Sequence, residues 1–180
     1  MVLVLLMLNT IGCGSQKVVS HDATLDSIAF WLNQADENLA VSPDFLQKRV
    51  DTMRAQLFYI DSVMPGLGSR EDEVGLAYNV YASALKVFDD YLEAFDPFLL
   101  ENQFLQKELA EVREGLKLKT GVEKEDLEAR IPVLRQRANA NYMATKSLIR
   151  AYLDVLRPFQ RKRKIIDHLF LKLVEKNSDN

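Results

Sequence analysis

The chain has 180 residues, of which 48% are apolar and 27% are charged, and its formal net charge at pH 7 is −3. That balance is ordinary for a folded protein, and it excludes a disordered chain and the strongly basic composition of a general nucleic-acid binder. Seven glycines and five prolines leave little material for strands joined by tight turns, so the composition favours helix.

An apolar run opens the sequence and leads to the single cysteine, Cys13. Residues 1–8 are all apolar, and the sequence becomes polar soon after the cysteine. The run has the length of the apolar region of a signal peptide, and it is well short of the roughly 20 residues that a membrane-spanning helix needs. Residues 1–12 are therefore expected to be a targeting segment. The alternative is a buried N-terminal strand or helix in which Cys13 is an inert core thiol.

The Ile11-Gly12 pair directly before Cys13 resembles the lipobox of bacterial membrane lipoproteins. The resemblance covers the N-terminus alone, and it implies that 1–12 is a cleaved signal peptide and that Cys13 carries the lipid, palmitate included. Residues 13–21 would then form a flexible tether. The glycine that follows Cys13 implies, for a Gram-negative bacterium, an outer-membrane anchor with the protein facing the periplasm.

Apolar residues at helical spacing begin after the tether. The first series predicts one helix face and comprises Leu25, Ile28, Leu32, Ala35 and Leu39. Ser42-Pro43 then interrupts, because proline suits the first turn of a new helix. A second series continues on the same line with Leu46, Val50, Met53, Leu57, Ile60 and Met64. Residues 22–64 are thus predicted to form a first leg, either kinked or split at Pro43.

Pro65 to Gly68 is the clearest turn, and a second leg is expected over 70–118. Its heptad-like series is Val74, Tyr78, Tyr81, Leu85, Phe88, Leu92, Phe95 and Leu99. Beyond Pro97 the series resumes one position out of step, which predicts a rotation of the buried face. Gly121 marks the stop.

A last leg over 123–176 carries a long series that is mostly apolar, with Asn141, Thr145 and Lys162 at three of its positions. Pro132 and Pro158 would each bend this helix by removing a backbone hydrogen bond. Residues 177–180 have the composition of a disordered tail.

The three legs have similar lengths and short connections, which makes neighbours antiparallel. The predicted fold is therefore all-α, an elongated antiparallel three-helix bundle of long heptad-patterned helices over 22–176, with four helices if the first leg splits at Pro43. The alternative is a compact four-helix bundle formed by folding the second leg back at Pro97.

No set of residues predicts catalysis, so we expect a protein that is not an enzyme and has no cofactor. A nucleophile elbow and a glycine-rich phosphate loop are both missing from the sequence. His21 and His168 lie at opposite ends of the chain, outside the Glu-x-x-His pairs of a di-metal bundle, and one cysteine disfavours zinc. We expect no metal site.

Two groups of residues are candidates for binding. Five basic residues within eight positions predict a patch for anionic lipid or an acidic partner, with a solvated helix face as the alternative: Arg157, Arg161, Lys162, Arg163 and Lys164. Aromatic residues on the predicted seams could line a slot for an apolar ligand or could simply be core: Tyr78, Tyr81, Phe88 and Tyr152. Asn141 and Thr145 could serve that slot or fix the register of the helices.

These observations favour a non-enzymatic lipoprotein, held at the membrane by its lipid, that acts as a scaffold or adaptor for a protein partner in a bacterial cell-envelope assembly. Nucleic acid is not an expected partner, because stacking aromatics do not alternate with the basic residues. The alternative is an envelope carrier that binds an apolar ligand between its helices. An internal cavity would favour the carrier, and a close-packed seam with apolar residues exposed elsewhere would favour the adaptor.

Overall fold

The computed structural model describes residues 21–178, and every regular element in that range is helical. The elements, with a short 3₁₀ turn labelled η1, are α1 (His21–Asn38), α2 (Pro43–Val63), η1 (Leu67–Ser69), α3 (Glu73–Leu118) and α4 (Val122–Ser178). The predicted signal peptide, the predicted lipid attachment at Cys13 and most of the predicted tether lie outside the described residues.

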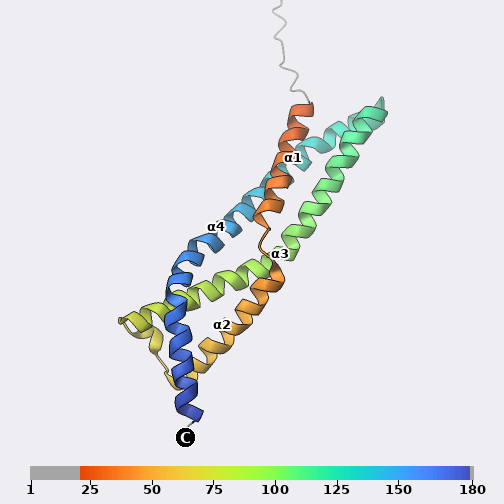
Figure 1. The fold of residues 1–180 in the computed structure, drawn as a ribbon. Coiled ribbons are helices and arrows are strands. Elements are labelled where there is room, and N and C mark those ends of the chain that lie inside the picture. The colour runs from red at the N-terminus through yellow and green to blue at the C-terminus, as the bar shows by residue number, and fades with distance from the viewer. Residues whose placement is uncertain (1–20, 179–180) are drawn as a thin grey trace, which may run out of the picture.

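The helices form the predicted elongated bundle of three antiparallel legs (Figure 1). α1 and α2 follow one another along the first leg, α3 runs back, and α4 returns along both of them. The first leg is interrupted at residues 39–42, just before Pro43 starts α2, so the predicted break is confirmed, and it allows the bundle to be described with four helices. α3 continues through Pro97, which contradicts the alternative of a chain reversal there.

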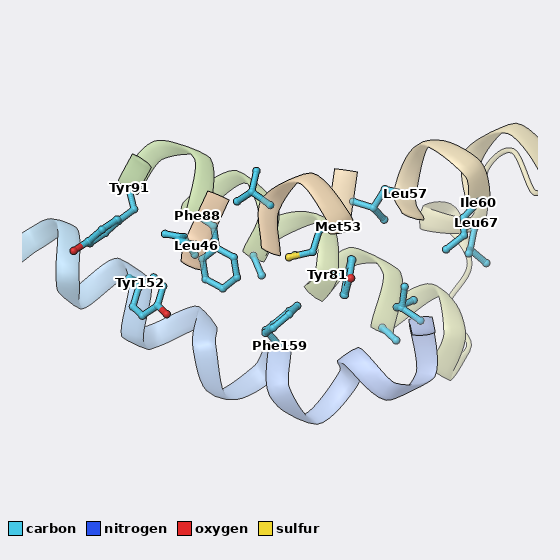
Figure 2. Close-up of a cluster of buried hydrophobic side chains, with 14 residues drawn as sticks. Leu46, Met53, Leu57, Ile60, Leu67, Tyr81, Phe88, Tyr91, Tyr152 and Phe159 are labelled. Carbon is cyan, nitrogen blue, oxygen red and sulfur yellow. The ribbon is translucent and has the colours of Figure 1, made fainter. Parts of the chain in front are cut away.

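Because the first leg is broken, the bundle has two hydrophobic cores placed end to end. The first joins α1 to the C-terminal half of α3 and the N-terminal half of α4, and it is aliphatic. The second joins α2 to the other halves of α3 and α4, and it combines aliphatic side chains with buried aromatic rings (Figure 2). Phe88 is fully buried in it, and its ring centroid lies 5.2 Å from that of Tyr152 and 5.4 Å from that of Phe159.

A layer of buried amides lies near the junction of the two cores. The Nδ2 of Asn102 donates to the Leu32 carbonyl at 3.0 Å and to the Asp36 carboxylate at 2.6 Å. Its Oδ1 accepts from the Nδ2 of Asn141 at 3.0 Å. Thr145 accepts from Asn38 at 3.3 Å. Asn141 and Thr145 thus bond within the bundle, which agrees with the register interpretation of these residues.

The burial pattern of α3 corrects one expectation. The seam prediction is right for Tyr81 and Phe88, but Ala77, Ala84 and Tyr91 are buried as well, whereas Tyr78 is only half-buried. α3 packs against α2 on one side and against α4 on another, so its buried stripe is wider than a single seam. The two alanines fit this position because their small side chains let the helices approach closely.

Candidate binding groove between α2 and α4

A groove with a volume of about 590 Å³ lies between α2 and α4, with α3 beneath it. Its floor consists of three buried side chains, Met53 of α2, Tyr81 of α3 and Phe159 of α4. Figure 2 shows the Phe159 and Tyr81 rings next to each other, and their centroids are 5.4 Å apart. The remaining lining residues are Phe45, Lys48, Arg49, Thr52 and Gln56 of α2, and Arg163, Asp167, Phe170 and Leu171 of α4.

A chain of hydrogen bonds crosses the groove from α3 through α2 to α4. The Tyr81 hydroxyl donates to Oε1 of Gln56, and Nε2 of Gln56 donates to Oδ1 of Asp167 at 3.1 Å. The other carboxylate oxygen of Asp167 accepts from Nε of Arg163 at 3.1 Å. Burial, followed by the nearby charge of Asp167, raises the pKa of Tyr81 to about 12, so its hydroxyl stays protonated and remains a donor.

The α2 side of the groove carries positive charge that no carboxylate compensates. Arg49 lies over the rings of Phe45 and Phe159, with its guanidinium carbon 4.8 and 5.7 Å from the two centroids. Within residues 21–178, neither Arg49 nor Lys48 forms an ion pair. Among the described lining residues Asp167 is the single acid, and it already accepts from two donors. The groove therefore combines an aromatic floor with a net positive rim.

Apolar side chains are also exposed at the mouth of the groove. Phe45 on α2 and Leu171 on α4 each leave 57% of their surface accessible. Aromatic and arginine side chains around a small apolar depression are typical of the energetically dominant part of a protein interface. The arrangement is suited to binding a group that is apolar at one end and anionic at the other.

The five basic residues predicted as one patch do not form one patch. Arg163 lines the groove, and Lys162 points toward α3, where its Nζ lies 3.3 Å from Oε1 of Glu73. Arg157, Arg161 and Lys164 are exposed on another face of α4. Five residues within eight positions span about two helical turns, so they necessarily point in several directions.

The predicted aromatic slot is largely filled by its own rings. Phe88 and Tyr152 pack against each other in the second core, and Tyr81 alone of the four lines the groove. Tyr78 lies at the edge, where its hydroxyl donates to Oδ1 of Asp61 at 2.6 Å. Burial and that hydrogen bond raise the pKa of Tyr78 to about 12.

Sequence reasoning missed the α2 wall, although a signal for it exists. Phe45, Arg49, Thr52 and Gln56 recur at spacings of four, three and four residues, which places them on one stripe. That stripe runs beside the buried seam that begins at Leu46. A mixed aromatic and polar stripe next to a seam is a candidate groove wall. The residues of α4 that form the opposite wall are more than 100 positions away in the sequence, so the stripe alone does not reveal them.

Among residues 21–178, no group of three or more histidine, cysteine and acidic side chains is arranged to hold a metal ion. None of the described helices has an apolar stretch long enough to cross a membrane. Comparisons of this chain with protein-family models, with curated proteins and with solved structures found no match.

Proposed function

We propose that this protein is a non-enzymatic adaptor whose α2–α4 groove binds a segment of a partner protein. The observation that carries the proposal is the groove itself, which joins exposed apolar side chains to two cations that lack carboxylate partners. A partner segment would place an apolar side chain over Tyr81 and Phe159, and an acidic residue beside Lys48 and Arg49.

The packing of the second core supports an adaptor over a carrier with an internal cavity. The buried Phe88 ring contacts the rings of Tyr152 and Phe159 inside the bundle, whereas the open volume lies at the surface. A surface groove with Phe45 and Leu171 exposed at its mouth is accessible to a folded partner. Such apolar exposure beside a polar rim marks interaction sites on otherwise polar surfaces.

The proposal also includes a lipid anchor at the bacterial cell envelope. It is supported by the lipobox-like residues before Cys13, and it would hold the bundle at the outer membrane, facing the periplasm. Labelling cells with a fatty-acid analogue should tag the natural protein and leave Cys13→Ala untagged. An untagged natural protein would contradict the anchor and leave the groove proposal standing.

Site-specific crosslinking tests the groove. A photo-crosslinking amino acid at Thr52, which lines the groove, should capture a protein partner in cells, while the same probe at the exposed Gln47 on another face of α2 should not. Adding Arg49→Glu should abolish the crosslink from Thr52, because it places a negative charge where the partner's acidic residue would bind. Equal capture from both positions, or capture unaffected by Arg49→Glu, would contradict the adaptor.

The volume of the groove supports a carrier as the second candidate. About 590 Å³ lies within the range of roughly 300 to 1,000 Å³ that small-molecule sites occupy. The ligand would be a small amphiphile with an anionic end. Native mass spectrometry of the purified protein distinguishes the two functions: a carrier should retain a small molecule that Arg49→Glu releases, and an adaptor should show the mass of the protein alone.

A further inference from the structure

The outer face of α4 carries a second cationic feature, which shares none of its basic residues with the groove. Five exposed basic side chains follow one another along the helix, and we call them the α4 basic stripe: Arg150, Arg157, Arg161, Lys164 and Lys172. At 100° per residue, their positions stay within about a quarter of the helix circumference. At about 1.5 Å per residue, the stripe is about 33 Å long.

The stripe is not neutralised by the protein's own acids. Within residues 21–178, none of its five side chains forms an ion pair or a side-chain hydrogen bond. Cations elsewhere in the bundle do pair, such as Arg113 with Asp26 at 2.6 Å and Arg137 with Glu101 at 2.9 Å. Asp154 and Glu175 are acids on the same face, so the stripe and its surroundings remain net positive.

Apolar side chains accompany the stripe along one side. Leu153 and Leu171 are 56% and 57% exposed, and they are 18 residues apart, which is five full helical turns. A hollow beside Pro158 is lined by Leu153, Arg157 and Arg161, and also by Asp154. Exposed leucines beside a row of cations are the pattern of helices that lie in a membrane interface.

We propose that the α4 basic stripe binds an anionic lipid surface, with lipid phosphates beside the cations and the two leucines entering the headgroup region. A row of cations along one helix fits an extended anionic surface better than a compact acidic protein. Nucleic acid is disfavoured, because aromatic side chains that could stack on bases do not lie on the stripe.

The position of the stripe adds a consequence for orientation. His21, the first described residue, lies 3.6 Å from Glu128 of α4, and Arg150 is 22 residues further along that helix. The stripe thus begins about 33 Å from the end at which α1 starts. If Cys13 is lipidated, an anchor at one end and a lipid-binding face toward the other lay the bundle along the membrane. The stripe itself does not depend on that anchor.

Vesicle binding tests the proposal with the full chain carrying Cys13→Ala, so that no covalent lipid contributes. We expect it to bind phosphatidylcholine vesicles that contain phosphatidylglycerol, and to bind far less in high salt or to phosphatidylcholine alone. Reversing three charges of the stripe (Arg157→Glu, Arg161→Glu, Lys164→Glu) should weaken binding at least about 100-fold, since each basic residue near an anionic membrane contributes about fivefold.

A matched control reverses three exposed, unpaired cations elsewhere: Lys107→Glu, Lys117→Glu and Arg135→Glu. It changes the net charge equally and should retain most of the binding, with helix content by circular dichroism unchanged in both variants. An equal loss in the two variants, or equal binding to neutral vesicles, would overturn the proposal. Binding to an acidic polypeptide but not to vesicles would overturn it in favour of a protein partner. Arg49→Glu should leave vesicle binding unchanged, which separates this test from the groove.

Discussion

Replacing Asn102 with leucine should destabilise the bundle by about 2 to 4 kcal/mol, because the buried amide of Asn141 would then have no hydrogen-bond partner. Asn102 is fully buried, and its carboxamide makes three hydrogen bonds, to Leu32, Asp36 and Asn141. Oδ1 of Asn141 already has no hydrogen-bond partner in the described structure. Without Asn102, the Nδ2 of Asn141 would lose its acceptor as well.

The size of the effect follows from these contacts. A buried polar group left unsatisfied costs about 1 to 3 kcal/mol, and a lost neutral hydrogen bond costs about 1 kcal/mol. The Asp36 carboxylate contributes little to the loss, because it is exposed to water and still accepts from Gln106 at 2.6 Å. The desolvated Asn141 amide therefore dominates the predicted cost.

The double variant Asn102→Leu/Asn141→Leu should be more stable than Asn102→Leu alone. Leucine has the same branched arrangement of heavy side-chain atoms as asparagine, and replacing both amides removes every unsatisfied group of the pair. We expect a coupling free energy of at least about 1 kcal/mol between the two sites, which contacting residues commonly show. The double variant should keep its helix content.

Urea unfolding followed by circular dichroism measures these free energies, and thermal unfolding checks them. A chain of this size loses about 2 to 4 °C in Tm per kcal/mol, so Asn102→Leu should lower Tm by about 5 to 15 °C. Gln106→Ala, at the solvent edge of the same network, should change stability by less than about 0.5 kcal/mol. If the two leucine substitutions proved additive, the argument from unsatisfied amides would be wrong.

Three further perturbations test the core, one turn and the tyrosines. Phe88→Ala removes a fully buried ring of the second core and should cost about 3 to 5 kcal/mol in urea unfolding; a loss below 1 kcal/mol would contradict tight packing there. Gly75→Ala should lower Tm, because its Cβ would lie 2.2 Å from the Arg70 carbonyl oxygen; an unchanged Tm would refute that close approach. The pKa of both Tyr78 and Tyr81 is raised from 10 to about 12, so the protonated form is favoured in the fold. The contribution of these two tyrosines to stability should therefore be constant below about pH 10 and fall from pH 10 to 12. Tyr78→Phe should make that fall less steep, and an equally steep fall in the variant would contradict the raised pKa of Tyr78.

Local sequence signals predicted where the helices end. Pro43 lacks a backbone N–H and suits a first helical turn, and α2 begins there. Gly121 adopts a positive φ of 61° between α3 and α4, a conformation that glycine enters without a steric penalty. Pro132 and Pro158 were expected to bend the last leg, and Pro97 was the site of the alternative chain reversal. All three lie inside continuous helices, since packing against the neighbouring legs outweighs one lost hydrogen bond.

The candidate site was only partly predictable. Tyr81 and Arg163 were both singled out, but in two different hypothetical sites, and the groove brings them together. Heptad spacing identifies the buried face of each helix, but it does not determine the distance between two helices beside that face. Lys48 and Arg49 were missed because they line a site only through the spacing between α2 and α4.

Local patterns were enough to predict the all-α class, the three long legs and the break before Pro43, because these depend on periodicity and on proline and glycine, which act within a few residues. Helix packing, in contrast, creates the groove and the buried amide layer, and it separates the basic residues into a groove cation, a paired lysine and a stripe. Those features join residues far apart in the chain, such as Gln56 and Asp167, which are 111 positions apart. Their contacts are set by the packing of whole helices, which no local pattern encodes.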